Sequence, residues 1–163
     1  MTARAGDATV VVATRTEERA VRRFAPQFRV HRAGVSLRQW NHAISTPVVI
    51  SAGLAGGLEP GNPPGTVVVA SDVALADGER IACDPIWIDA LMSAAHALDL
   101  PVITGGIVTA DTLVTGAARS QWARSGYVAA DMESGLLVGR APRVVALRVL
   151  LDTPTRELSP RWE

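Results

Sequence analysis

The chain has 163 residues, 48% of them hydrophobic, so it can bury one core but is too short for two ordinary domains. Sixteen basic residues balance sixteen acidic ones and only 4% of residues are aromatic, which argues against a nucleic-acid partner. No apolar run approaches the roughly 20 residues that cross a bilayer, and the first residues lack the apolar stretch of a signal peptide. We expect a single cytoplasmic domain over residues 1–163, without stable membrane insertion.

Short runs rich in β-branched residues predict strands along the whole chain. Several of these runs are apolar on both faces, as expected when helices cover both sides of a largely parallel sheet. Residues 154–163 are polar and contain proline, which predicts a loop or an unpaired tail. The predicted strands are residues 8–13, 28–30, 47–52, 66–70, 101–104, 127–130 and 144–150.

Helical segments separate these strands, and two of them begin with recognisable caps. Thr14 and Glu17 have the spacing of a capping box. Asp84 before Pro85 places a cap ahead of a first-turn proline. The alternation of strand and helix predicts one three-layer α/β domain with right-handed crossovers. The predicted helices are residues 14 to about 23, 86–98, 117–124 and 133–138.

Cysteine and histidine give no sign of a metal site. The single Cys83 excludes an internal disulfide and a multi-cysteine metal site, and we expect it to pack in the core. His31, His42 and His96 lack the spacing of metal ligands. We therefore expect neither a metal nor a bound cofactor.

The first segment that points to chemistry is residues 48–58, a buried strand that continues into Gly53, Gly56 and Gly57. Small residues at the carboxyl end of a parallel strand let a ligand lie against bare backbone, where open α/β sheets bind their ligands. The alternative is a tight connection from strand to turn with no ligand.

The second segment delivers Asp131, Met132 and Glu133 from a strand into a helix start. Asp131 can be an ordinary N-cap, and Glu133 can be a first-turn carboxylate favoured by the helix dipole. The functional alternative is that the Glu133 carboxylate accepts hydrogen bonds from a vicinal diol such as the ribose hydroxyls. Met132 then packs against the sugar, or it fills the core.

The third segment is an apolar strand that contains Arg148 and ends at Asp152. A carboxyl group held among apolar side chains can remain protonated near neutral pH and act as a general acid. Aspartate before Thr153 and Pro154 is also a common way to begin a turn. From this segment alone, Asp152 can be either a general acid or the first residue of a turn.

In this order the three segments resemble the superfamily of purine nucleoside phosphorylases and methylthioadenosine nucleosidases. The resemblance covers most of the chain and is firmest over residues 48–156. Residues 78–87, the acidic pair at Glu17 and the ending at residues 152–156 look closest to the hopanoid-associated phosphorylase branch. The resemblance implies a phosphorylase/hydrolase-like fold with a central mixed, mostly parallel sheet flanked by helices.

The same resemblance implies cleavage of the N-glycosidic bond of a purine nucleoside, of adenosyl type, with a bulky 5′ substituent in the hopanoid branch. Asp152 matches the proton donor to the purine, and Glu133 matches the carboxylate that binds the ribose hydroxyls. Glu17 is the candidate base for water, with Glu18 as the alternative register, and a purely capping role for Glu17 is equally open. The substrate-binding residues that the resemblance implies are Leu54, Ala55, Gly56, Leu113, Val114, Met132 and Glu133.

The nucleophile is open between water and phosphate, which is the possible co-substrate. A phosphorylase needs converging arginines, and Arg32 and Arg148 are the candidates, although Arg148 can equally be a strand residue that reaches solvent. Members of the superfamily usually continue into a terminal helix where this sequence ends at Glu163, so we expect a domain shortened at its C-terminus with an open pocket. The alternative function is therefore a catalytically degenerate nucleoside-binding or scaffold protein.

A homo-oligomer is expected, because a small apolar domain gains from extra burial and members of the superfamily form dimers or larger rings. Four tryptophans are candidate interface anchors, and the first three can equally pack in the core. They are Trp40, Trp87, Trp122 and Trp162.

Overall fold

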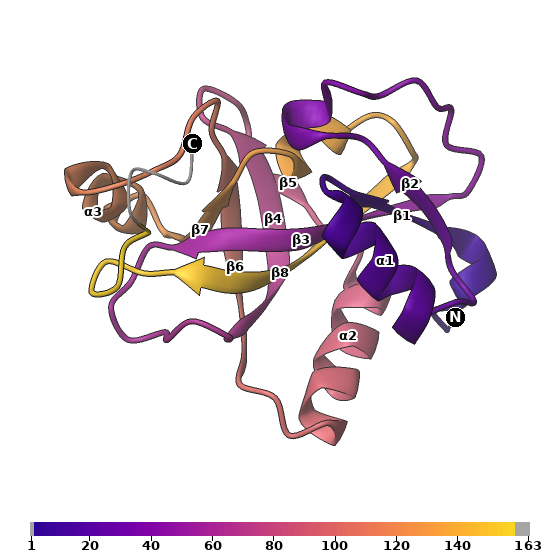
Figure 1. Ribbon diagram of the computed structural model, residues 1–163, viewed down its shortest axis with the longest axis horizontal. Helices are drawn as coiled ribbons and strands as arrows, with labels where there is room; N and C mark the ends of the chain where they lie inside the picture. The colour runs from indigo at the N-terminus through magenta and orange to yellow at the C-terminus, as the bar shows by residue number, and fades with distance from the viewer. Residues whose placement is uncertain (1, 159–163) are drawn as a thin grey trace.

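The computed structural model describes residues 2–158, which form an α/β fold in which helices flank one mixed sheet of eight strands (Figure 1). The strands are β1 (Ala8–Val12), β2 (Arg29–Arg32), β3 (Val48–Gly57), β4 (Val67–Leu75), β5 (Ile81–Ala82), β6 (Val102–Thr109), β7 (Tyr127–Asp131) and β8 (Arg143–Asp152). The helices are α1 (Arg15–Phe24), α2 (Pro85–Ala97) and α3 (Ala117–Arg124), with short 3-10 turns η1 (Ala5–Asp7), η2 (Val35–Leu37) and η3 (Ser134–Leu137).

Five of the strands close into a ring. β3 pairs with both β7 and β8, β8 also pairs with β4, and β4 returns through β6 to β7. β1 and β2 extend the sheet from β3, and β5 lies at the edge of β4. Five pairings are parallel and three are antiparallel. The prediction of a mixed, mostly parallel sheet flanked by helices is confirmed.

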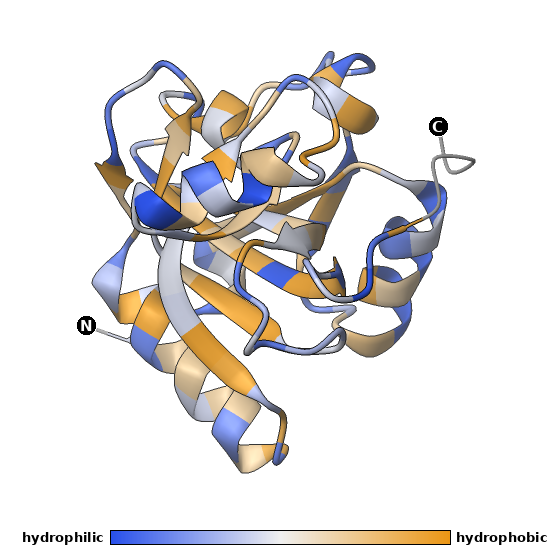
Figure 2. Cartoon of the chain, turned by 90° about the vertical axis from the view of Figure 1, so that its left-hand side faces the viewer, coloured by the Kyte–Doolittle hydropathy of each residue, from blue (hydrophilic) through white to orange (hydrophobic). Residues whose placement is uncertain are grey.

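The strands are apolar on both faces because the interior of the ring and the flanking helices cover them. Val48 and Val49 point to opposite sides of β3, yet neither is exposed. α2 packs against β4 and β6, and α3 packs against β7. Hydrophobic residues concentrate on the strands, with hydrophilic ones at the outer loops and helical turns (Figure 2).

Both predicted helix caps are present. The Thr14 side chain accepts a hydrogen bond from the Glu17 amide, and the Glu17 carboxylate accepts one from the Thr14 amide, which completes the capping box of α1. The Asp84 side chain accepts from the Trp87 amide, and Pro85 occupies the first turn of α2. These local signals therefore placed two helix starts correctly.

The strands predicted over residues 47–52, 66–70 and 101–104 end too early. β3 continues through the glycines to Gly57, so this segment is extended strand rather than a turn. Glycine has little intrinsic preference for a strand, and here pairing with β7 and β8 on both sides keeps the segment extended. The short β5 was not predicted.

The helix predicted over residues 133–138 is wrong, because the chain forms only the 3-10 turn η3 there. A Cβ atom on Gly135 would lie 2.9 Å from the carbonyl oxygen of Ala74, so the turn packs directly against the backbone of β4. Residues 153–158 turn back beside α3, with reciprocal backbone hydrogen bonds between Thr153 and Arg156.

Trp87 lies in the core, where it packs near Phe28 with ring centroids 6.0 Å apart. Trp40 and Trp122 are partly buried against the apolar clusters. Residues 159–163, with Trp162, lie outside the described residues. None of the helices between residues 2 and 158 is long and apolar enough to cross a membrane.

Candidate functional site

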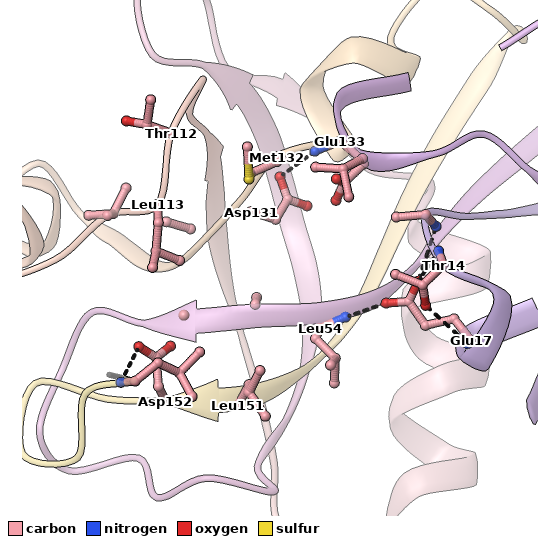
Figure 3. A pocket seen from close by; sticks show the side chains of 17 residues that line it. Thr14, Glu17, Leu54, Thr112, Leu113, Asp131, Met132, Glu133, Leu151 and Asp152 are labelled. Atoms are coloured by element: carbon pink, nitrogen blue, oxygen red, sulfur yellow. Dashed lines mark hydrogen bonds between the residues drawn. The ribbon is translucent and has the colours of Figure 1, made fainter. Parts of the chain in front are cut away.

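A pocket of about 200 Å³ lies where the carboxyl ends of β1, β7 and β8 meet the second half of β3. This is the edge at which α/β sheets bind ligands. The nine residues that the sequence analysis gave as catalytic or substrate-binding all line this pocket: Glu17, Leu54, Ala55, Gly56, Leu113, Val114, Met132, Glu133 and Asp152. Figure 3 shows Glu17 and Asp152 on opposite sides of Leu54, with Met132 and Glu133 across from β3.

Glu17 combines its capping role with a position in the pocket. Its Oε2 accepts hydrogen bonds from the amides of Ala13 and Thr14, at 3.1 and 2.7 Å. Its Oε1 accepts from the Leu54 amide at 3.2 Å, so the carboxylate is fixed against β3. The alternative register is not supported, because Glu18 pairs with Arg22 and Arg32 and does not line the pocket.

Arg148 is buried beside this end of the pocket, with a side chain only 1% exposed. The interpretation of Arg148 as a strand residue that reaches solvent is wrong, because residues 148, 150 and 152 share the buried face of β8. Its Nη2 lies 2.8 Å from Asp131 Oδ2 and 3.6 Å from Glu133 Oε2. It also donates to Ser51 Oγ at 2.5 Å and Ser134 Oγ at 3.0 Å. Among residues 2–158, its Nε has no hydrogen-bond partner.

Asp131 is more than an N-cap. It accepts from the Ser134 amide at 3.2 Å, as a capping aspartate would. It is also buried, it pairs with Arg148, and it accepts from the Thr109 hydroxyl at 2.6 Å. Asp131, which itself lines the pocket, therefore holds Arg148 in place.

Glu133 is held across the pocket from Glu17. Its Oε1 accepts from the amide of Ser36, which has a positive φ of 52°. Such left-handed non-glycine residues are strained, and they cluster at functional sites. Burial raises the pKa of the Glu133 carboxyl above its ordinary value, and the charge of Arg148 opposes that effect only in part. The fold thus holds the Glu133 carboxyl at the pocket even though burial disfavours its charged form.

Replacing Glu133 by glutamine is expected to stabilise the fold at neutral pH. Because the pKa of Glu133 is raised, the folded protein binds its proton more tightly than the unfolded chain does. The resulting stability is present below the unfolded value and is lost as the pH rises through the folded value. Thermal unfolding should therefore give a higher Tm for Glu133→Gln than for wild type at pH 7.5, with the difference vanishing towards pH 4. A lower Tm at pH 7.5 would mean that pairing with Arg148 outweighs burial.

Gly53 is the point where Glu17 and Arg148 approach β3. A Cβ atom on Gly53 would lie 2.5 Å from Arg148 Nη1 and 2.6 Å from Glu17 Oε1. Real Cβ contacts are not this short, so a larger residue would displace at least one of the two side chains. The glycine that suggested a ligand against bare backbone instead makes room for a carboxylate and a guanidinium.

Asp152 marks the other end of the pocket, and its surroundings differ from those expected. Instead of apolar side chains alone, it meets the guanidinium of the fully buried Arg119, whose Nη2 donates to Asp152 Oδ2. Arg119 also donates from Nη1 to the carbonyl oxygen of Gly57 at 2.6 Å. Arg119 comes from α3, and no local sequence signal connects it to the end of β8.

A bulge aims Asp152 at β3. The register between β3 and β8 shifts so that Ala55 pairs with Leu150 while Gly56 pairs with Asp152, and bulges of this kind re-aim side chains near active sites. A Cβ on Gly56 would lie 3.1 Å from both Asp152 Oδ1 and Arg119 Nη1. Gly53, which faces Glu17 and Arg148, and Gly56, which faces Asp152 and Arg119, are three residues apart, about 10 Å along an extended strand.

Between these two ends the pocket is largely apolar. Four of its lining side chains are hydrophobic and exposed: Val35 (43%), Leu54 (46%), Leu113 (37%) and Leu151 (38%). Thr112, Leu151 and Leu158 also line the pocket and were not predicted from the sequence. They lie in loops and strand ends without a recognisable pattern.

Within residues 2–158, no three His, Cys, Asp or Glu side chains are grouped so that they could hold a metal ion. His31 and His42 stack on each other with ring centroids 4.5 Å apart, and neither lines the pocket. Arg32, the other candidate for phosphate, pairs with Glu18 and does not line the pocket either. Burial raises the pKa of the Cys83 thiol to about 12, which suits a protonated core residue.

Comparison with known proteins gives a family and a fold. The model of the Phosphorylase superfamily matches residues 3–141. No curated protein matches the chain in sequence. Among solved structures, the 5′-methylthioadenosine/S-adenosyl homocysteine nucleosidase of Campylobacter jejuni has a TM-score of 0.76 at 14% identity, over 94% of this chain and 88% of that one.

Two further solved structures are similar. The 5′-methylthioadenosine/S-adenosylhomocysteine nucleosidase of Neisseria meningitidis, in complex with methylthio-immucillin-A, gives a TM-score of 0.75 at 20% identity, over 91% of this chain and 87% of that one. The futalosine hydrolase of Helicobacter pylori gives 0.75 at 15% identity, over 89% and 84%. At these identities the likeness shows a shared fold.

Proposed function

Since this chain belongs to the phosphorylase superfamily, we propose that it is an enzyme that hydrolyses the N-glycosidic bond of a purine nucleoside. The observation that carries the proposal is a carboxylate at each end of one pocket with a buried arginine nearby: Glu17 lies with Arg148 near Gly53, and Asp152 is paired with Arg119. The solved structures with the same fold, which include two nucleosidases and a futalosine hydrolase, support it.

The two ends of the pocket fit the two proton transfers that hydrolysis needs. A purine leaves its sugar readily only when a proton reaches the base, and the sugar passes through an oxocarbenium-like state. In the proposed reaction Asp152 gives its proton to the purine as the bond from the sugar C1′ to the base breaks. Glu17 takes a proton from water as the water oxygen bonds to C1′. Glu17 faces β3 at Gly53 and Asp152 faces it at Gly56, and the pocket between these two points is proposed to hold the sugar and the water.

Glu133 and Met132 are proposed to hold the ribose between these groups. The Glu133 carboxylate keeps acceptor capacity after it binds the Ser36 amide, and ribose offers two neighbouring hydroxyls as donors. Met132 lines the pocket beside it and presents an apolar surface to the sugar. Neither role requires a cofactor, so water and the side chains supply the whole proposed reaction.

The charge around Arg148 favours water over phosphate as the nucleophile. Asp131 and Glu133 already face this guanidinium, and Glu17 is close enough that its charge acts on Glu133. A phosphate dianion here would meet carboxylates instead of a free arginine cluster.

Isotope labelling tests this choice. Incubation with methylthioadenosine in ¹⁸O-water should release adenine and place the label on C1′ of the free sugar, at a rate that added phosphate does not change. Release of a sugar 1-phosphate, or dependence on phosphate, would contradict hydrolysis. No release of adenine from any purine nucleoside, from a folded protein, would contradict the proposal as a whole.

The apolar mouth of the pocket supports an apolar substituent on the 5′ carbon, which is also what the hopanoid-associated branch implies. Replacing Leu54 by asparagine is expected to raise KM about 10-fold for a nucleoside with an apolar 5′ group, because burying a leucine-sized contact is worth about 1.5–3 kcal/mol. KM for adenosine, whose 5′ group is a hydroxyl, should change little. The matched control is Leu98→Asn on the exposed end of α2, where the leucine is 70% exposed. Equal changes in KM for both nucleosides would contradict this role.

A degenerate nucleoside-binding protein is the second candidate. The observation that favours it is the ion pair between Asp152 and Arg119, since a carboxylate held by a buried guanidinium must first take up a proton to act as an acid. Binding of a nucleoside without any turnover would distinguish this candidate. The expected homo-oligomer stays a prediction, for which light scattering is the measurement.

A further inference from the structure

Glu157 reaches back from the end of the chain to the far side of the pocket. Its Oε1 accepts a hydrogen bond from the Gly116 amide at 2.8 Å and another from Arg119 Nε at 3.1 Å. Its side chain is 37% exposed, whereas that of Arg119 is 1% exposed. The two contacts tie the segment after β8 to the start of α3.

This tie joins two walls of the pocket. Leu113 and Val114 precede Gly116 in the chain and line one side, and Leu158 follows Glu157 and lines another. The Leu158 amide also points at Asp152 Oδ2, at 3.4 Å. The contacts of Glu157 therefore hold together the two pocket walls that enclose Asp152.

Arg119 divides one positive charge between two carboxylates. Its Nη2 faces the buried Asp152 and its Nε faces the half-exposed Glu157. From β3, the neighbours of Asp152 are the backbone of Gly56 and Gly57, which carry no charge. Among residues 2–158, Arg119 on α3 is the charged group paired with Asp152, and Glu157 on the terminal segment bears on Asp152 through Arg119.

We propose that Arg119 is a positioning residue for Asp152 and that Glu157, here called the latch, weakens the attraction of Arg119 for the Asp152 carboxylate. This inference rests on the proposed function. With Glu157 in place, the attraction of Arg119 is shared, so Asp152 can take up the proton that it delivers to the purine. Without the charge of Glu157, Arg119 holds Asp152 more firmly as a carboxylate.

The variant Glu157→Gln tests the latch while keeping its hydrogen bonds, because the amide oxygen can still accept from Gly116 and Arg119. The alkaline limb of the pH profile of kcat should move to lower pH, so kcat at neutral pH falls several-fold while KM does not rise. Glu59→Gln, which changes an exposed loop carboxylate bound to Asn62, is the matched control. An alkaline limb at the wild-type pH in Glu157→Gln would overturn the proposal.

A second measurement keeps the latch testable if the protein shows no turnover, which would instead contradict the proposed function. NMR of protein labelled with ¹³C-aspartate follows the Asp152 carboxyl directly, with the signal assigned by its loss in Asp152→Asn. The titration curve of this signal should lie at lower pH in Glu157→Gln than in wild type. Superimposed curves would overturn the inference, whatever the activity.

Discussion

Asp152→Asn is expected to lower kcat for purine release by about 10²- to 10⁴-fold, the usual contribution of a positioned general acid. The asparagine amide has nearly the same shape and can still accept a hydrogen bond from Arg119, but it has no acidic proton to give to the base. KM should change far less than kcat, because the pocket walls stay in place. The measurement is the initial rate of adenine release from methylthioadenosine.

A substrate that needs no acid separates proton donation from a structural role of Asp152. A nitrophenyl riboside leaves as a stable anion, so Asp152→Asn should cleave it at close to the wild-type rate. Asp89→Asn on the exposed surface of α2 is the matched control. Since removing the charge of Asp152 leaves buried Arg119 with less compensation, Tm is measured for each variant. Equal losses on both substrates in a folded protein would contradict the assignment.

Gly53→Ala is expected to lower kcat/KM by about 10²-fold, because a misplacement of about 1 Å at reacting groups can have such an effect. The added Cβ would meet Arg148 Nη1 and Glu17 Oε1 at 2.5 and 2.6 Å, so the base candidate and the buried arginine cannot both keep their positions. The φ of Gly53 is not in the left-handed region, so alanine fits the backbone itself. The loss should appear with purine and nitrophenyl substrates alike.

Gly61→Ala is the matched control for this glycine. A Cβ on Gly61 meets nothing within 4 Å, and its φ is not positive either. Activity should therefore remain at the wild-type level. Wild-type kcat/KM in Gly53→Ala would contradict the view that the positions of Glu17 and Arg148 beside Gly53 matter for the reaction.

The sequence predicted most accurately the structural features that depend on residues close together in the chain. The caps at Thr14 and Asp84 need only residues three positions away, so both helix starts were correct. The candidate residues in the pocket were found through the resemblance to the superfamily, whose matching segments include the carboxyl ends of β7 and β8, and such strand ends meet at one edge of a sheet. Their chemical roles remain predictions.

Features that depend on distant parts of the chain could not be predicted. The closure of the strands into a ring follows from β8 pairing with both β3 and β4, which periodicity does not encode. Arg119 looked like an ordinary helix residue, since its partners Gly57 and Asp152 lie 62 and 33 positions away. The sequence alone also leaves Arg148 open as a strand residue in solvent, because its acidic partner Asp131 comes from another strand.

The most direct test of the central claim is to follow adenine release from methylthioadenosine by the wild-type protein in phosphate-free buffer, alongside equilibrium binding of the same nucleoside. Hydrolysis at this pocket predicts many molecules of adenine per molecule of protein, with free sugar in equal amount. Saturable binding without adenine, repeated with a nucleoside that carries a larger apolar 5′ group, would contradict the enzyme and leave a nucleoside-binding protein.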